Sequence, residues 1–282
     1  MKVFNKKRDL EKLIRSIKKE NKTIGLVPTM GALHKGHLSL VKKALADNDE
    51  VFVSIFVNPT QFNNKNDLLK YPRTLEKDLD HLKTVDKKII VFAPSIDDIY
   101  DDNVNATQFN FGGLEFEMEG EFREGHFNGV GTIVKELLHI VKPNNAYFGE
   151  KDFQQLQIIK KLVENFNIPV KIIGCKIHRE PNGLAMSSRN IRLKPNYKKA
   201  APFIHKTLKT AKLKFGTKSA AHVTKWVNKQ FADHDLLKLE YFRIANVDTL
   251  KEVKRKSKNK KYRAFIAVYA DDVRLIDNIA LN

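Results

Sequence analysis

The sequence predicts an α/β fold, in which a parallel sheet with flanking helices is followed by a smaller α+β domain. Over residues 23–175, short apolar runs rich in β-branched residues alternate with helical patterns, as in βαβ units. After Arg192 the pattern changes to two lysine-rich helical segments and two strand-like runs. The chain of 282 residues also exceeds the roughly 150 residues of one typical domain. We therefore expect two domains, residues 1–185 and residues 186–282.

The first domain is predicted to begin with an amphipathic helix, because four apolar residues lie at helical spacing: Leu10, Leu13, Ile14 and Ile17. The expected strands span residues 23–27, 51–57, 88–93, 146–148 and 169–174. The expected helices between them span residues 36–48, 74–83, 129–141 and 152–166, each long enough for a right-handed crossover. Ligands of such a sheet bind at the carboxyl ends of its strands. The irregular segment 101–128 is expected to form a flap over that edge.

The second domain is predicted to contain helices near residues 197–215 and 219–232, and strands near residues 239–247 and 262–270. A dense basic run, Lys251–Lys261, lies between the two strands. We interpret it as a solvated hairpin tip.

The charge balance discriminates weakly among functions. The chain has 51 basic and 33 acidic residues, which gives a formal net charge of +18 and raises the question of a polyanionic partner such as RNA. The lysines are, however, dispersed over helical faces, so we expect no specific nucleic-acid partner. A positive field would also attract an anionic small substrate such as ATP.

Several features indicate a soluble, cytoplasmic protein with no membrane contact. No apolar run approaches the roughly 20 residues needed to cross a bilayer. The first 20 residues lack the apolar core of a signal peptide. The single cysteine, Cys175, cannot form an intrachain disulfide, and its apolar surroundings predict a buried strand residue without a reactive role.

The strongest local signal is the segment Gly25–Leu40, GLVPTMGALHKGHLSL. A predicted strand runs into a Pro-Thr-Met-Gly turn and then into a helix that opens with His34 and His37. Unpaired amides at the start of a helix favour anions, and imidazoles three residues apart share one helical face. The segment therefore predicts phosphate binding, with histidine donating to charge on a leaving pyrophosphate. A structural helix start with incidental histidines, or a metal site, are the alternatives.

A second signal is the segment Met186–Asn190, which follows the turn-rich Arg179–Gly183. Two adjacent hydroxyls and a guanidinium on a mobile loop are suited to hold and release a triphosphate. An ordinary polar loop is the alternative. Together with the first segment, and in this order, it resembles the two signature segments of the nucleotidyltransferase superfamily, which also contains class I aminoacyl-tRNA synthetases.

Two further motifs each follow a predicted strand directly. In Tyr147–Asp152, the ammonium of Lys151 can meet phosphate, and the carboxylate of Asp152 can orient it or hold Mg²⁺. In Phe56–Phe62, Gln61 is neutral and can both donate and accept, as recognition of a hydroxy acid requires. Salt-bridged or ordinary turns are the alternatives for both motifs.

Taken together, seven motifs resemble the pantothenate synthetase family (pantoate–β-alanine ligases) in order and spacing. They are PTMGALHxGH, FVNPxQF, YPR, GHFxGV, YFGEKDxQQ, REPxGLAMSSRN and RLIDNI. The resemblance covers the chain from about residue 20 to its end. It implies a Rossmann-like first domain, a smaller carboxyl-terminal domain that closes over the site, and a homodimer. It also implies the reaction: pantoate and Mg-ATP give pantoyl adenylate and pyrophosphate, and β-alanine then displaces AMP.

The resemblance also implies roles for residues at the matching positions. His37 takes the acid role, and charge on the leaving group is stabilised by His34, Lys151, Ser187, Ser188 and Arg189. Pantoate is bound by Gln61 and Gln155, and Arg123 lies near the phosphates or the closing loop. The implied ATP-binding residues are Met30, Gly31, Ala32, Leu33, His34, Lys35, Gly36, His37, Gly149, Glu150, Lys151, Asp152, His178, Met186, Ser187, Ser188 and Arg189.

The sequence departs from the family pattern at several positions. Asn63 and Asn64 replace the Gly-Pro or Gly-Ala that commonly follows the QF pair, and His178 stands where the family places a small apolar residue. Lys77 replaces a frequent carboxylate before Asp78, the candidate Mg²⁺ ligand. We expect the Mg²⁺ to arrive with ATP, held mainly by phosphate oxygens.

Two other functions stay open at this point. The first is another adenylate-forming or nucleotidyl-transferring enzyme of the same superfamily, although no long anticodon-binding module follows the second signature segment. The other is an RNA-binding protein, which the net charge suggests and which predicts steeply salt-dependent binding.

Overall fold

The computed structural model describes residues 1–62, 65–100 and 104–282, and the chain divides into two compact units. Unit 1 comprises residues 1–150 and 155–176, and unit 2 comprises residues 151–154 and 177–282. The residues Asn63 and Asn64, at which the sequence departs from the family pattern, lie outside the described residues.

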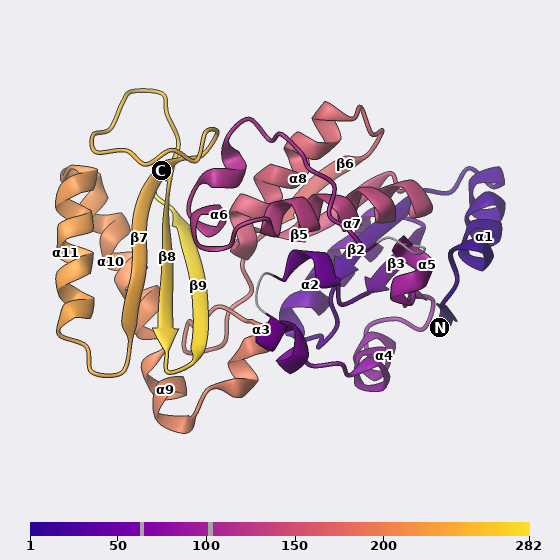
Figure 1. Ribbon diagram of the computed structural model, residues 1–282, viewed down its shortest axis with the longest axis horizontal. Coiled ribbons are helices and arrows are strands. Elements are labelled where there is room, and N and C mark those ends of the chain that lie inside the picture. The colour runs from indigo at the N-terminus through magenta and orange to yellow at the C-terminus, as the bar shows by residue number, and fades with distance from the viewer. Residues whose placement is uncertain (63–64, 101–103) are drawn as a thin grey trace. The chain divides into compact units, whose positions relative to one another are not determined.

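Unit 1 is built on a six-stranded sheet in the order β1-β4-β3-β2-β5-β6, and every strand pairing is parallel (Figure 1). This confirms the predicted parallel α/β architecture. The strands are β1 (Lys2–Phe4), β2 (Ile24–Thr29), β3 (Glu50–Ile55), β4 (Ile90–Phe92), β5 (Asn145–Gly149) and β6 (Lys171–Cys175). The edge strand β1 was not predicted, because three residues are too few to show an alternating pattern.

The helices of unit 1 are α1 (Lys7–Lys19), α2 (Lys35–Asp47), α3 (Lys65–Lys70), α4 (Leu75–Lys83), α5 (Ile96–Tyr100), α6 (Glu119–Phe122), α7 (His126–Val141) and α8 (Phe153–Asn165). Four of them match the predicted crossovers, namely α2, α4, α7 and α8, whereas the short helices α3, α5 and α6 were not predicted. Short 3-10 turns are η1 (Pro59–Gln61), η2 (Leu114–Phe116) and η3 (Glu150–Asp152). Segment 101–128, which we expected to form an irregular flap, contains η2, α6 and the start of α7, and its residues 101–103 lie outside the described residues. The amphipathic pattern of α1 is confirmed, because Leu10, Ile14 and Ile17 are buried.

Unit 2 is a three-stranded antiparallel sheet with helices against it (Figure 1). The strands are β7 (Lys238–Asn246), β8 (Tyr262–Ala270) and β9 (Val273–Ala280), and the helical elements are η4 (Ser188–Arg192), α9 (Pro195–Ala200), α10 (Phe203–Thr217) and α11 (Ala220–Ala232). The predicted helix at residues 197–215 is in fact two helices, because Pro202 has no amide hydrogen to donate and breaks the ladder. Strand β9 was missed, because Asp277 and Asn278 interrupt its apolar run.

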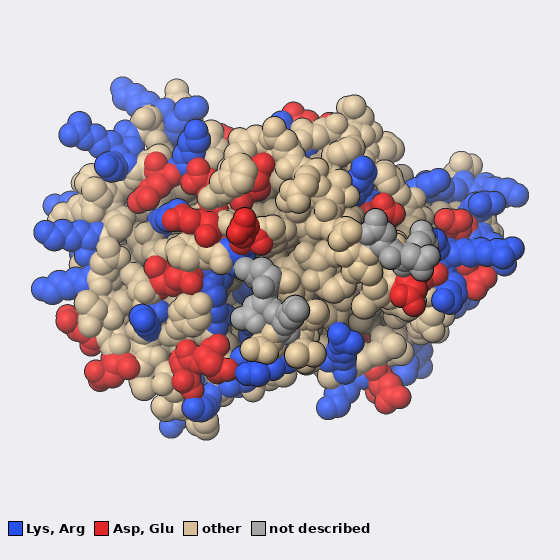
Figure 2. Space-filling model, in the orientation of Figure 1, with Lys and Arg blue, Asp and Glu red and all other residues tan. Residues whose placement is uncertain are grey.

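Lysine and arginine side chains cover exposed faces of each unit. Figure 2 shows them over α1, and over α10, α11 and the loop that connects β7 to β8. That loop contains Lys251–Lys261, whose basic side chains are exposed. The basic run is therefore the solvated hairpin tip that the sequence predicted. Within the described parts of the chain, no helix combines the length and the apolarity needed to span a membrane.

Cys175 lies at the end of β6, as predicted, but it is only half-buried rather than fully buried. Strand β6 is the edge strand of the sheet, which explains its partial exposure. Burial nevertheless raises the pKa of the thiol, which disfavours the reactive thiolate.

A buried tyrosine ties β5 to the end of α2. The Tyr147 hydroxyl accepts a hydrogen bond from Asn48 Nδ2 at 2.7 Å and donates to Asp47 Oδ2 at 3.0 Å. Gly25 leaves room for this contact, because a Cβ there would lie 2.7 Å from Asn48 Nδ2. Burial, and then the neighbouring Asp47, raise the pKa of Tyr147 to about 12.

We predict that Tyr147→Phe lowers the free energy of unfolding by about 1–2 kcal/mol near neutral pH, because two hydrogen bonds are lost. The folded-state pKa lies above the ordinary value of 10.0, so the stabilisation by the phenol is complete below that value and is lost as the pH rises toward about 12. The variant should lack this alkaline loss. Urea unfolding at neutral and at alkaline pH measures both effects. Tyr269→Phe, at an exposed residue, is the control and should change stability by less than about 0.5 kcal/mol.

Candidate active site

A tight left-handed turn follows β2 and connects it to α2. Thr29 begins the turn: its Oγ1 donates to Ser54 O at 2.7 Å and accepts from Gly31 N at 3.2 Å. Gly31 has φ +81° and Ala32 has φ +50°, both in the left-handed region. Glycine tolerates this conformation, whereas alanine there carries a cost of roughly 1–2 kcal/mol. Some other interaction must therefore hold the turn in place.

That interaction is made by Asp78 in α4, which is only 1% exposed. Its Oδ2 accepts from Ala32 N at 2.9 Å, and its Oδ1 accepts from Leu33 N at 2.6 Å. Thr74 Oγ1 lies 3.4 Å from Oδ2, and His81 Nδ1 lies 3.1 Å from Leu33 O. Side chains of α4 thus contact two amides of the turn, those of Ala32 and Leu33, and the carbonyl of Leu33. The amides of Ala32 and Leu33, which precede α2, are therefore bonded to the Asp78 carboxylate.

The two histidines of the segment cap the start of α2. His34 is the N-cap residue, and its Nδ1 accepts from Gly36 N at 3.1 Å. His37 Nδ1 accepts from His34 N at 3.3 Å, and the two ring centroids lie 4.1 Å apart. A ring nitrogen that accepts a hydrogen bond carries no proton. In the neutral state each ring therefore has its proton on Nε2, so each is a donor at that atom without needing a positive charge.

Gln61 lies in η1, and hydrogen bonds hold both its side chain and that of Asn58, the N-cap residue of η1. Asn58 Nδ2 donates to Gln61 Oε1 at 3.3 Å and to Gly129 O at 3.0 Å. Gln61 Nε2 donates to Met30 Sδ, and Gln61 O lies 2.8 Å from His126 Nδ1. Unit 1 therefore brings Gln61 next to the turn after β2. The amide orientation follows, because Asn58 supplies a donor to Oε1.

Arg123 is linked to Gln61 through His126. The carbonyl of Gln61 can only accept, so His126 carries its proton on Nδ1. His126 Nε2 is then the acceptor for Arg123 NH1, at 3.1 Å. Glu119 Oε2 lies 3.9 Å from the same guanidinium. Sequence reasoning assigned no role to Asn58 or His126, although both fall within motifs that carry the resemblance.

The other predicted residues of unit 1 lie on β5, its following turn and α8. Gly149 ends β5, Glu150 begins η3, and Gln155 lies on α8. All three are partly exposed.

Lys151, Asp152 and the segment His178–Asn190 belong to unit 2. Lys151 Nζ lies 3.5 Å from Asp152 Oδ1. Ser187 is the N-cap residue of η4, and its Oγ accepts from Arg189 N at 3.2 Å, so its hydroxyl proton is directed elsewhere. His178 is exposed, and its carbonyl accepts from Met186 N at 3.0 Å.

The segment that we expected to be a mobile loop is held by internal hydrogen bonds. Arg179 and Ala185 form a β-bridge. Asn190, which is buried, donates from Nδ2 to Glu180 Oε1 and to Ala185 O, at 3.1 Å each. These contacts stabilise the hairpin segment that contains Met186, Ser187, Ser188 and Arg189.

The described residues contain no group of three or more His, Cys, Asp or Glu side chains placed to hold a metal ion. Both oxygens of Asp78, the candidate Mg²⁺ ligand, are engaged by backbone amides. The side chains of unit 1 therefore do not form a ready-made Mg²⁺ site around Asp78.

Comparison with known proteins gives matches over the whole chain. The family model for pantoate-beta-alanine ligase matches residues 2–280. A pantothenate synthetase of Christiangramia forsetii is 57% identical over 282 residues and 100% of both chains. One of Flavobacterium psychrophilum is 56% identical over 279 residues and 99% of both chains.

Solved structures of the same enzyme are also similar. The crystal structure of pantothenate synthetase from Thermus thermophilus gives a TM-score of 0.91 at 34% identity, over 100% of this chain and 99% of that one. The pantoate-beta-alanine ligase of Francisella tularensis, determined in complex with beta-gamma ATP and beta-alanine, gives a TM-score of 0.81 at 39% identity, over 100% of this chain and 98% of that one.

We predict that Asp78→Ala destabilises the protein by about 2–4 kcal/mol, because it leaves two amides without their charged acceptor. Hydrogen exchange at the amides of Ala32 and Leu33 should accelerate more than exchange in the neighbouring strands. Asp80→Ala is the matched control, because Asp80 lies on the same helix and pairs with Lys83 at the exposed surface. Unchanged exchange at both turn amides in Asp78→Ala would contradict the assigned role.

Proposed function

The chain belongs to the pantoate–β-alanine ligase family, and from that membership we propose that it condenses (R)-pantoate with β-alanine at the expense of ATP. The reaction passes through pantoyl adenylate and releases pyrophosphate and AMP. The observation that carries this proposal is the full-length match, in which the motif residues occupy the predicted strand ends. The same match favours this function over another adenylate-forming enzyme and over an RNA-binding protein.

In the first half-reaction, a pantoate carboxylate oxygen attacks the α-phosphorus of ATP, and the bond to the pyrophosphate oxygen breaks. Negative charge then grows on the leaving pyrophosphate. We assign His34 and His37 as donors to that charge through their Nε2–H groups. Their Nδ1 atoms are engaged by backbone amides, which supports donation by the neutral rings. Such donors, fixed before the reaction, need no reorganisation in the transition state.

Unit 2 supplies the cationic and hydroxyl groups of the proposal. We assign Lys151, Ser187, Ser188 and Arg189 to the phosphates of ATP. Asp152 beside the ammonium, and the N-cap position of Ser187, support these roles. The remaining ATP contacts are proposed at Met30–His37, at Gly149–Asp152, and at Met186 with the backbone of His178. For Ala32 and Leu33 we propose side-chain rather than amide contacts.

Pantoate recognition is assigned to Gln61 and Gln155, with Arg123 acting near the phosphates. Gln61 is neutral, so it can bind the hydroxy acid without holding the carboxylate back from attack. Its fixed amide orientation supports this role. In the second half-reaction, the β-alanine amine attacks the acyl carbon, and the bond to AMP breaks.

Mg²⁺ is proposed to enter with ATP, bound to phosphate oxygens, where it neutralises charge. Because the oxygens of Asp78 accept amide hydrogens, we assign Asp78 to the turn rather than to the metal. A homodimer and a cytoplasmic location are proposed from the family resemblance alone.

The proposed function is tested by exchange of labelled pyrophosphate into ATP, with Mg²⁺ and pantoate present and β-alanine absent. Exchange that depends on pantoate is the expected result, since adenylation is reversible. If folded protein gives no exchange with pantoate, the adenylate mechanism is wrong for this chain.

We predict that His37→Asn and His37→Gln differ in what they lose. Asparagine can keep the acceptor near the Nδ1 position but has no donor at the position of Nε2, so exchange should fall by about 10²–10³-fold with little change in stability. Glutamine reaches the outer position and should retain more exchange than asparagine. Lys151→Ala should also lose exchange while remaining folded. Near-normal exchange in His37→Asn would refute the donor role.

A further inference from the structure

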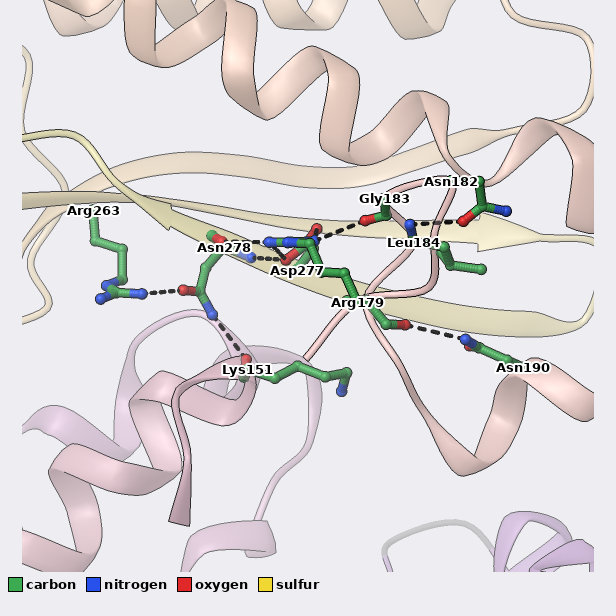
Figure 3. A network of polar contacts seen from close by, with 10 residues as sticks. Lys151, Arg179, Asn182, Gly183, Leu184, Asn190, Arg263, Asp277 and Asn278 are labelled. Carbon is green, nitrogen blue, oxygen red and sulfur yellow. Dashed lines mark hydrogen bonds and ion pairs between the residues drawn. The ribbon is translucent and has the colours of Figure 1, made fainter. Parts of the chain in front are cut away.

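We propose that two consecutive residues of β9, Asp277 and Asn278, are positioning residues for adenylation. Each holds one of the two ATP-handling segments of unit 2: the segment that begins at Lys151 and the hairpin His178–Asn190 (Figure 3). The inference rests on the proposed function of those segments. Neither residue is assigned to contact substrate.

Asp277 holds the hairpin through Arg179. It is 5% exposed, and its carboxylate accepts two hydrogen bonds from the guanidinium, at 2.6 Å from NH1 and 2.9 Å from NH2. NH1 also donates to Gly183 O at 3.1 Å, across the turn of the hairpin. The bidentate pair therefore fixes the orientation of the Arg179 guanidinium, which in turn holds the carbonyl of Gly183 in the hairpin turn.

Asn278 holds the other segment. It is 1% exposed, and its Nδ2 donates to Lys151 O at 2.8 Å. Its Oδ1 accepts from Arg263 NH1, and the Arg263 guanidinium lies 4.0 Å from the centre of the Phe153 ring. The segment is thus fixed at two points, the carbonyl of Lys151 and the ring of Phe153.

The position of these residues on a strand explains how one dipeptide serves two segments. Successive side chains of a strand point to opposite faces, and β9 is paired with β8 over its whole length. Figure 3 shows Asp277 directed to Arg179 and the hairpin, and Asn278 directed to Arg263 and Lys151. The strand therefore fixes the spacing between the Lys151 backbone and the hairpin that carries Ser187–Arg189.

Stability alone does not explain these contacts. A buried ion pair contributes little net stability, because desolvation offsets most of the attraction. The bidentate pair of Asp277 and the side-chain amide of Asn278, which both donates and accepts, instead fix the positions of the two segments. A displacement of about 1 Å in a positioning group can cost on the order of 10²-fold in rate.

The test uses two nearly isosteric variants of the full chain. Asn278→Asp can keep the contact with Arg263 but places an oxygen against Lys151 O, and Asp277→Asn removes one acceptor from Arg179. Glu240→Gln is the matched control, because Glu240 of β7 pairs at 2.5 Å with Arg274, which lies on β9 like the test residues, and neither partner belongs to either segment.

We expect each test variant to reduce kcat/KM for ATP in pantoate-dependent pyrophosphate exchange by about 10²-fold. The KM for β-alanine in the complete reaction should change less than twofold, and the control should stay within about threefold of wild type. Rates are expressed per folded molecule, from the unfolding curve of each variant. If either variant does not fold, Arg179→Lys replaces Asp277→Asn, and Arg263→Lys replaces Asn278→Asp.

Several outcomes would overturn the inference. Wild-type exchange per folded molecule in the test variants would do so, and so would a loss equal to that of Glu240→Gln. Equal impairment of the kinetic constants for ATP and for β-alanine would also do so, because it indicates a general structural effect. Failure of the proposed function is distinguishable, since wild-type protein would then show no pantoate-dependent exchange.

Discussion

The buried carboxylate of Asp78 is the contact on which the rest of the proposed catalytic edge of unit 1 depends. It accepts the amides of Ala32 and Leu33 at 2.9 and 2.6 Å, in a turn whose alanine has φ +50°. Hydrogen bonds to a charged acceptor contribute about 1.5–3 kcal/mol each, which exceeds the roughly 1–2 kcal/mol of strain in the turn. Helix α2 therefore starts at a fixed point beyond β2, and His34 and His37 are placed by that start.

The same geometry sets the chemistry of the two histidines. A phosphate site at a helix start is usually explained by its amides and by the helix dipole. Here the amides of Ala32, Leu33, His34 and Gly36 bond to side chains of the protein. In the proposed function, the imidazoles are donors to the anion as well. In unit 2 the analogous constraint is β9. Its adjacent residues Asp277 and Asn278 hold, respectively, the hairpin that contains Ser187 and the backbone of Lys151.

Much of this could be predicted from the sequence, because the relevant signals are local. The strand before Met30, the helix that opens with His34 and His37, and the parallel sheet all follow from periodicity and turn residues over short windows. The contact of Asp78 with the turn could not be predicted, because its partner Leu33 lies 45 residues away and no local pattern reports that contact. Strand β9 was missed for a related reason: Asp277 and Asn278 break its apolar pattern, and their partners Arg179 and Lys151 are distant in sequence.

The proposed chemistry depends on backbone amides that hold the neutral rings of His34 and His37 with their protons on Nε2. The most direct measurement is the nitrogen-15 chemical shift of both imidazoles, observed through their carbon-bound ring protons at a pH where the rings are neutral. We expect an unprotonated Nδ1 and a protonated Nε2 in both residues. Protonation of Nδ1 in the neutral state of either ring would contradict this expectation, because that atom could not then accept the amide hydrogen that caps the helix.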